Sequence, residues 1–124
     1  MVAAGNDGAN AANYSPAGFN NVITVSALNP NNTFAFYSNY GSVVDLIAPG
    51  TNVESLWKNG GYNTTSGTTM ASPHVAGAAA LFCSSNAGAT FNTVRSGLIA
   101  AGEAGSWAGD PDGISEPLVD AQSL

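Results

Sequence analysis

The sequence predicts an α/β fold, with a partial, doubly wound and mostly parallel sheet flanked by helices. Three short, continuously apolar segments end in turns rich in Gly, Pro and Asn, which is typical of strands buried on both faces. A longer run of small apolar residues and a segment with apolar residues at helical spacing predict two helices. Because strands and helices follow one another along the chain, we expect a parallel sheet with helices covering both faces.

The predicted strands end at residues that favour turns. The strand segments are residues 2–4, 22–27 and 42–48, and a hairpin is expected from residues 53–57 and 62–66. The first strand leads into the turn at residues 5–8, and Pro49-Gly50 stops the third. Asn59-Gly60-Gly61 supplies the backbone freedom that the hairpin turn needs.

Two helices are predicted in the second half of the chain. Residues 69–84 are apolar on nearly every side, so this helix is expected to be buried, with Cys83 as a buried and inert thiol. Pro73 lies near the helix start, where no N–H is required. Residues 90–101 predict an exposed helix with one apolar face that contains Leu98.

Composition argues against several classes of function. The chain has 124 residues, enough for one domain with a modest core, but only 8% of them are charged. The formal net charge is −6, which disfavours binding to nucleic acid or to an anionic membrane surface. The acidic residues near the C-terminus predict a solvated segment. We expect neither a membrane span nor a signal peptide in these residues.

The segment Ser66–Gly77 carries the clearest chemical signal. A hydroxyl-rich turn leads directly into the long helix, so the hydroxyl of Thr69 lies near free N–H groups and the positive end of the helix dipole. That environment stabilises an oxyanion. Asn6 follows the first strand and could donate to the same oxyanion, although an Asn before Asp-Gly is by default a turn residue.

Ser66–Gly77 resembles the active-site segment of subtilisin-like serine proteases, in particular the proteinase K branch. The family pattern is Gly-Thr-Ser-Met-Ala, and Thr69 stands at the serine position. Further segments that resemble the family, in family order, are residues 13–17, 36–43, 48–51 and 113–121. The resemblance covers essentially the whole chain. It implies a subtilisin-like fold, peptide hydrolysis through an acyl-enzyme, and an extracellular location.

The resemblance also implies roles for individual residues. Thr69 takes the nucleophile position, while Asn6 and the backbone N–H of Thr69 form the oxyanion hole. The predicted substrate-binding residues are Ala3, Ala4, Gly5 and Thr68, the first three as one wall of the primary specificity pocket. Threonine keeps the hydroxyl but adds a β-methyl group that restricts χ1, so a loss of activity is expected at this position.

His74 is the only histidine of the chain and does not fit the role of general base. Residues five apart on a helix point about 140° away from each other, so His74 and Thr69 cannot share a hydrogen bond. In the family the catalytic histidine lies upstream of Asn6. We therefore expect residues 1–124 to form the C-terminal half of a subtilisin-like peptidase domain, without its catalytic Asp and His.

Two hypotheses about function stay open at this point. In the first, the chain is part of a serine endopeptidase, with a polypeptide substrate and the missing N-terminal half as its partner. In the second, it is an inactive pseudoprotease or truncated fragment that only binds peptide or a partner half. In either case the chain alone is expected to be marginally stable, with uncovered apolar faces that would favour a homo-oligomer.

Asp45 is a carboxylate in an otherwise apolar segment, so it needs hydrogen-bond donors or a cation. Hydrogen bonds from a neighbouring loop are one solution. The resemblance implies another, a structural calcium ion held by Asp45 and the carbonyls of Asn20 and Val22, although the loop at residues 18–21 departs from the family pattern. Residues 110–113 are a weaker calcium candidate, because their sequence favours a solvated turn over a metal site.

Overall fold

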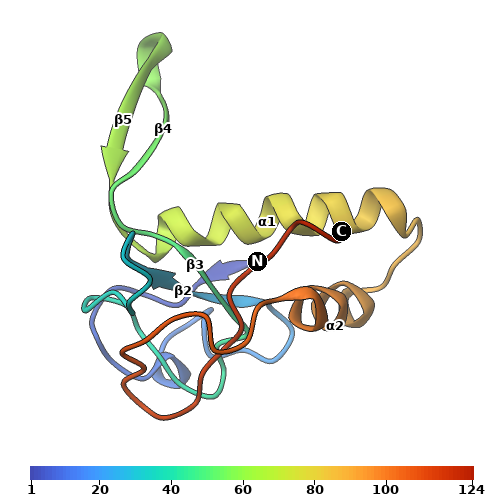
Figure 1. Cartoon of the computed structure of the whole chain (residues 1–124), viewed down its shortest axis with the longest axis horizontal. Coiled ribbons are helices and arrows are strands. Elements are labelled where there is room, and N and C mark those ends of the chain that lie inside the picture. The colour runs from blue at the N-terminus through green and yellow to red at the C-terminus, as the bar shows by residue number, and fades with distance from the viewer.

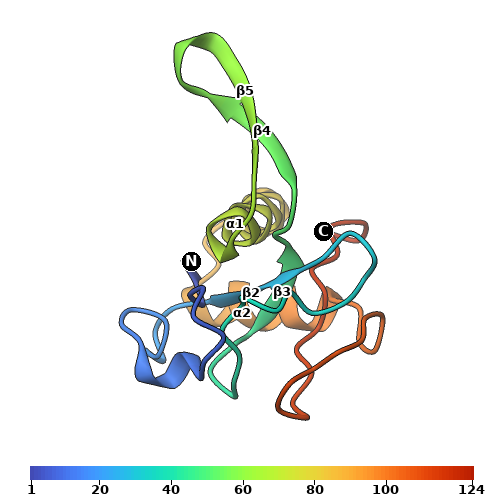
Figure 2. The same cartoon turned by 90° about the vertical axis from the view of Figure 1, so that its left-hand side faces the viewer.

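The computed structural model describes all residues, 1–124, and confirms the α/β class. The strands β1 (Val2–Ala3), β2 (Thr24–Leu28) and β3 (Leu46–Pro49) form a parallel sheet in the order β1-β2-β3. The long helix α1 (Thr68–Ser85) lies across the sheet and contacts all three strands (Figure 1). The helix α2 (Phe91–Ala101) contacts α1, and Figure 2 shows both helices around the same sheet.

The core lies between the sheet and α1. Every residue of β2 is buried, and Val25 pairs in register with Leu46 of β3. The side of α1 that faces the sheet is formed by residues spaced three or four apart, as expected for one face of a helix. These residues are Thr68, Ala71, Val75 and Ala78. Because two of them are alanines, the helix backbone can approach the strands closely.

The opposite face of α1 is uncovered in this chain. His74, Leu81 and Cys83 are exposed, so the expectation of a helix buried on every side, with a buried thiol, was wrong for residues 1–124 by themselves. The physical reason is that the sheet and α2 cover only part of the helix surface, while the small apolar residues on the remaining side contact solvent. The expectation of uncovered apolar helix surface is confirmed.

The third strand is shorter than the sequence predicts. It begins at Leu46 and not at residue 42, because a turn precedes it. Gly41 has a φ of 125°, and its carbonyl accepts a hydrogen bond from the N–H of Val44 at 3.1 Å. The apolar dipeptide Val43-Val44 lies in this turn, and from the sequence alone it resembles the start of a strand.

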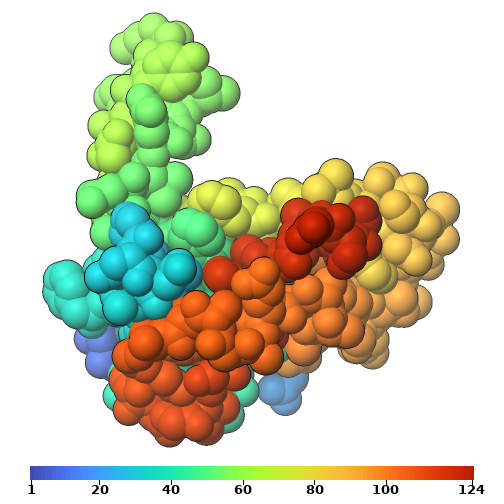
Figure 3. Space-filling model, viewed as in Figure 1, coloured from blue at the N-terminus to red at the C-terminus, as the bar shows by residue number.

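The hairpin is confirmed, with β4 (Val53–Trp57) paired to β5 (Gly61–Thr65) in antiparallel register. Asn59 and Gly60 at its tip have positive φ, as the turn requires. The hairpin projects away from the sheet as an arm near the N-terminal end of α1, and the space-filling view shows it free of the rest of the molecule (Figure 3).

The C-terminal segment is not simply a solvated acidic tail. The N–H of Ile47 donates to the carbonyl of Pro117, which aligns this segment beside β3. Glu116 is consequently buried, and its carboxyl group accepts a hydrogen bond from the hydroxyl of Ser26. Burial raises the pKa of Glu116 from an ordinary value of 4.5 to about 7.

This buried carboxyl group predicts a pH dependence of stability. Between pH 4.5 and about 7 the folded chain keeps the Glu116 proton that the unfolded chain releases. The free energy of unfolding therefore falls as pH rises through this range, by up to about 3 kcal/mol, and this contribution levels off above the folded-state pKa. Urea denaturation from pH 4.5 to 8 measures the effect. Glu116→Gln should flatten the profile; identical profiles for parent and variant would contradict the prediction.

Candidate active site

The turn after β1 and the start of α1 are joined by the side chains of Asn6 and Thr68. The Oδ1 of Asn6 accepts from the N–H of Thr68 at 2.8 Å and from its hydroxyl at 2.9 Å. The hydroxyl of Thr68 also accepts from the N–H of Gly5 at 3.1 Å. Because a backbone N–H can only donate, the amide oxygen of Asn6 must face the helix. Its Nδ2 group then has no hydrogen-bond partner within the chain.

The helix start leaves a second donor unpaired. Gly67 is the N-cap, with a φ of 153°, and its N–H donates to the carbonyl of Gly50 at 2.8 Å. The N–H of Met70 turns back to the carbonyl of Gly67 at 2.9 Å. The N–H of Thr69, between these residues, has no acceptor within the chain.

The absence of a side chain at Gly67 keeps the two donors and the hydroxyl together. A Cβ atom on Gly67 would lie 2.9 Å from the hydroxyl of Thr69 and 3.5 Å from the Nδ2 of Asn6. Both groups therefore flank the same side of Gly67, and both residues are exposed to solvent. Two free N–H donors at the positive end of an 18-residue helix, next to an exposed hydroxyl, can stabilise an oxyanion formed at that hydroxyl.

Asn39 supports this turn, and sequence analysis gave it no role. Its Oδ1 accepts from the N–H groups of Asp7 and Ala9, each at 3.0 Å, and its Nδ2 donates to the carbonyl of Ala4 at 3.0 Å. Gly5 is required here, since a Cβ would lie 2.4 Å from Asn39 Nδ2. The partners of this side chain lie 30 to 35 residues away in sequence, so no local pattern distinguishes Asn39 from the other asparagines.

The predicted substrate-binding residues occupy the end of β1 and the adjacent helix start. Ala3 is half-buried and Ala4 is buried at 1% exposure, while the N–H and carbonyl of Gly5 are both hydrogen-bonded inside the chain. This backbone is therefore held rigidly beside Asn6. Thr68 is fully buried, and its hydroxyl is used by Gly5 and Asn6, so its side chain positions Asn6 and does not face solvent.

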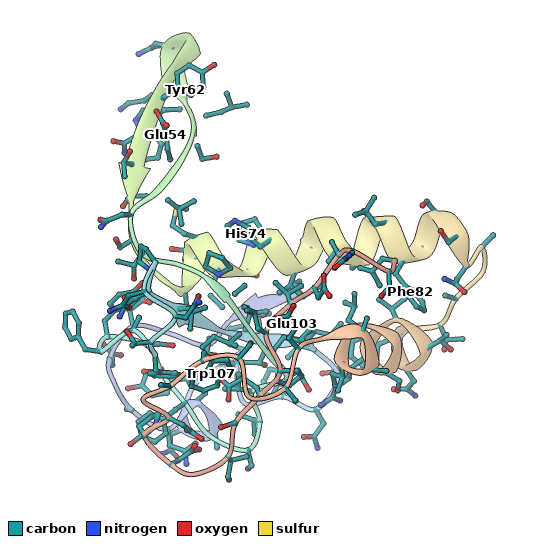
Figure 4. All side chains as sticks on the ribbon, viewed as in Figure 1. Glu54, Tyr62, His74, Phe82, Glu103 and Trp107 are labelled. Carbon is teal, nitrogen blue, oxygen red and sulfur yellow. The ribbon has the colours of Figure 1, made fainter.

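His74 lies on the exposed face of α1, on the side of the hairpin (Figure 4). Its Nδ1 donates to the carbonyl of Met70 at 2.9 Å, and it has no hydrogen bond to Thr69. With Glu54 it lines a shallow notch of about 230 Å³ between the hairpin and the helix. The spacing of five residues predicts that His74 is not the base for Thr69, and the structure agrees. The His74 side chain is exposed to solvent.

The carboxylate of Asp45 is buried and has protein donors on both oxygens. Its Oδ2 accepts from the N–H of Thr24 at 2.9 Å, and its Oδ1 accepts from the Nε of Arg95 at 2.8 Å. Arg95 also donates to the carbonyl of Asn20 at 3.1 Å, whereas the carbonyl of Val22 makes no hydrogen bond. No group of three or more His, Cys, Asp or Glu side chains is arranged to hold a metal ion.

An exposed hydroxyl and two unpaired N–H donors at a helix start are groups that a nucleophilic acyl-transfer site requires. Comparison with protein families identifies the class more closely. The model of the subtilase family of peptidases matches residues 1–113, and the chain belongs to this family.

Curated proteins and a solved structure agree with this assignment. The chain is 58% identical over 82 residues to "Subtilisin-like protease 2" of Pseudogymnoascus destructans, which covers 64% of the chain and 20% of that protein. It is 43% identical over 105 residues to "Alkaline serine exoprotease A" of Vibrio alginolyticus, covering 85% of the chain and 20% of that protein. The crystal structure of a cold adapted subtilisin-like serine proteinase matches all of the chain with a TM-score of 0.87 and 40% identity.

The chain spans about a fifth of the length of these two curated relatives and 44% of the solved structure. The fold expected from the resemblance is thus confirmed, as is the serine protease family. No helix of the structure has the length and apolar character needed to cross a bilayer.

The buried amide of Asn39 gives a test of how the site is held. Asn39→Ala removes three side-chain hydrogen bonds and leaves the buried carbonyl of Ala4 and the part-buried N–H groups of Asp7 and Ala9 without their partner. We expect the free energy of unfolding to fall by about 2 to 4 kcal/mol. Urea denaturation measures the change. Asn21→Ala, at an exposed position without a side-chain hydrogen bond, is the matched control and should stay within about 0.5 kcal/mol of the parent; equal effects of the two variants would refute the role of Asn39.

Proposed function

We propose that this chain carries the nucleophile position and the oxyanion hole of a peptide-hydrolysing subtilase site. The observation that supports this most directly is the pair of unpaired donors, Asn6 Nδ2 and the N–H of Thr69, next to the exposed hydroxyl of Thr69. The substrate would be a polypeptide, and the rigid backbone of residues 3–5 would form one wall of the pocket for its side chain.

In the proposed reaction the hydroxyl of Thr69 attacks the carbonyl carbon of the scissile peptide bond. The carbonyl oxygen becomes an oxyanion, which Asn6 and the N–H of Thr69 stabilise. Collapse of this intermediate breaks the C–N bond, releases the amine and leaves an acyl-enzyme, which water then hydrolyses. Each step needs a base to take a proton and return it, and His74 is turned to Met70.

We further propose that the base and its orienting carboxylate come from a segment outside residues 1–124, corresponding to the N-terminal half of a subtilase domain. The exposed face of α1 and the arm β4–β5 would pack against that half. The chain alone would then be inactive. An extracellular location is part of the same proposal and rests on the family.

The second candidate function is binding of peptide or of a partner half without catalysis. One observation favours it, namely threonine at the nucleophile position. The β-methyl group of threonine restricts χ1, and a displacement of about 1 Å can cost about 100-fold in rate.

The two functions differ in what happens when the site is completed. The chain alone should not react at Thr69 with a fluorophosphonate probe, as read by mass spectrometry. Joined to the upstream segment of the Vibrio alginolyticus relative, the Thr69→Ser variant should cleave a chromogenic peptide, about 100-fold faster than the joined chain with threonine. A folded, joined Thr69→Ser protein that cleaves no peptide would favour the binding function and refute the first proposal.

The oxyanion role of Asn6 has its own test in the joined Thr69→Ser protein. Asn6→Asp keeps the oxygen that Thr68 contacts but removes the Nδ2 donor. We expect kcat to fall by about 10² to 10³ with little change in KM. This range is the one known for loss of such a donor in a subtilisin, and the geometry of this chain does not supply it. Asn21→Ala is the control. A kcat within about threefold of the parent would remove Asn6 from the oxyanion hole.

A further inference from the structure

Three segments far apart in sequence meet at one buried carboxylate. Asp45 directly precedes β3, Thr24 begins β2, and Arg95 lies on α2. The Asp45 side chain is only 5% exposed, whereas the Arg95 side chain is 32% exposed and covers it from the solvent side. The guanidinium group also contacts the carbonyl of Asn20, so it connects α2 both to the sheet and to the loop before it.

The calcium ion implied by family resemblance would use the same oxygens. That set consists of the Asp45 carboxylate and the carbonyls of Asn20 and Val22. Both carboxylate oxygens and the carbonyl of Asn20 already accept hydrogen bonds from the protein, and only the Val22 carbonyl is free. Calcium takes six to eight oxygen ligands at 2.3 to 2.6 Å, so an ion could bind only if it displaced the guanidinium group. The residues present therefore do not fit calcium.

We propose that Arg95 is the permanent cation of this site and that the corner between α2 and the sheet forms without calcium. A buried carboxylate requires a counter-charge, and the planar guanidinium fork supplies both the charge and paired hydrogen bonds to one carboxylate. Arg95 is one of only two basic residues in the chain; the other is Lys58, at the tip of the hairpin. The inference is independent of the proposed peptidase activity.

The parent chain gives the first test. Its thermal midpoint in about 10 mM CaCl₂ should lie within about 1 °C of the midpoint in EGTA, and calorimetric titration with CaCl₂ should show no saturable heat. Calcium held with a Kd of about 0.1 mM would raise the midpoint by about 10 °C instead. The same titration is repeated on the double variant Asp110→Asn, Asp112→Asn, which lacks the two carboxylates of the acidic turn at residues 110–113. A calcium response of the parent that persists in this variant would overturn the proposal; one that disappears would leave the Asp45 site free of calcium, as proposed.

Two single substitutions give the second test. Arg95→Ala removes the counter-charge of a buried carboxylate and should lower the thermal midpoint by about 5 to 10 °C, measured in EGTA. Lys58→Ala makes the same change in net charge at an exposed position and should lower it by less than about 2 °C. Equal midpoints for the two variants would overturn the proposal. If Arg95→Ala does not fold, the calcium titration of the parent still decides the question.

Discussion

The contact between Asn6 and Thr68 is the interaction on which the candidate site depends. It joins the end of β1 to the first residue of α1, two segments separated by 62 positions in the chain. One amide oxygen accepts two hydrogen bonds, which fixes the orientation of the whole amide group and leaves its nitrogen free. The same contact places the start of α1, and with it the N–H and hydroxyl of Thr69. A parallel sheet alone would bring these segments near each other but would not orient them.

The site is built from backbone and amide groups in place of charged side chains. Only 8% of the residues are charged, and the turn after β1 is held by Asn39, while Gly67 and Gly5 provide backbone conformations that other residues rarely adopt. Neutral donors have a physical advantage at an oxyanion site. They stabilise developing negative charge without a permanent charge that must be desolvated in the ground state. The one ion pair, between the buried Asp45 and the partly exposed Arg95 of α2, lies elsewhere.

Sequence reasoning could recover what depends on local pattern. The long helix was predicted to within one residue at each end, and Thr90 as the start of α2 is in fact its N-cap. Two kinds of feature were beyond it. Asn39 and Arg95 act through partners 30 or more residues away, so nothing near them in the sequence signals their roles. The burial of Glu116 likewise depends on how the C-terminal segment packs beside β3, whereas its acidic neighbours predict a solvated tail. The family resemblance predicts the groups of the candidate site but not these supporting residues.

The projecting hairpin β4–β5 is expected to be less stable against local unfolding than the core of the chain. The strands β4 and β5 form a separate two-stranded sheet with five residue pairs, and they do not pair with β1, β2 or β3. Isolated two-stranded hairpins have almost no stability of their own in water. Its opening is therefore uncoupled from the cooperative unfolding of the core, and its amide hydrogens exchange with solvent long before those of β2. The hairpin connects β3 to α1 along the chain. Local unfolding of the hairpin therefore gives a longer flexible connection between these two elements, which still contact each other directly. The contact between Asn6 and Thr68 does not involve the arm, so it still holds the residues of the candidate site together when the hairpin opens.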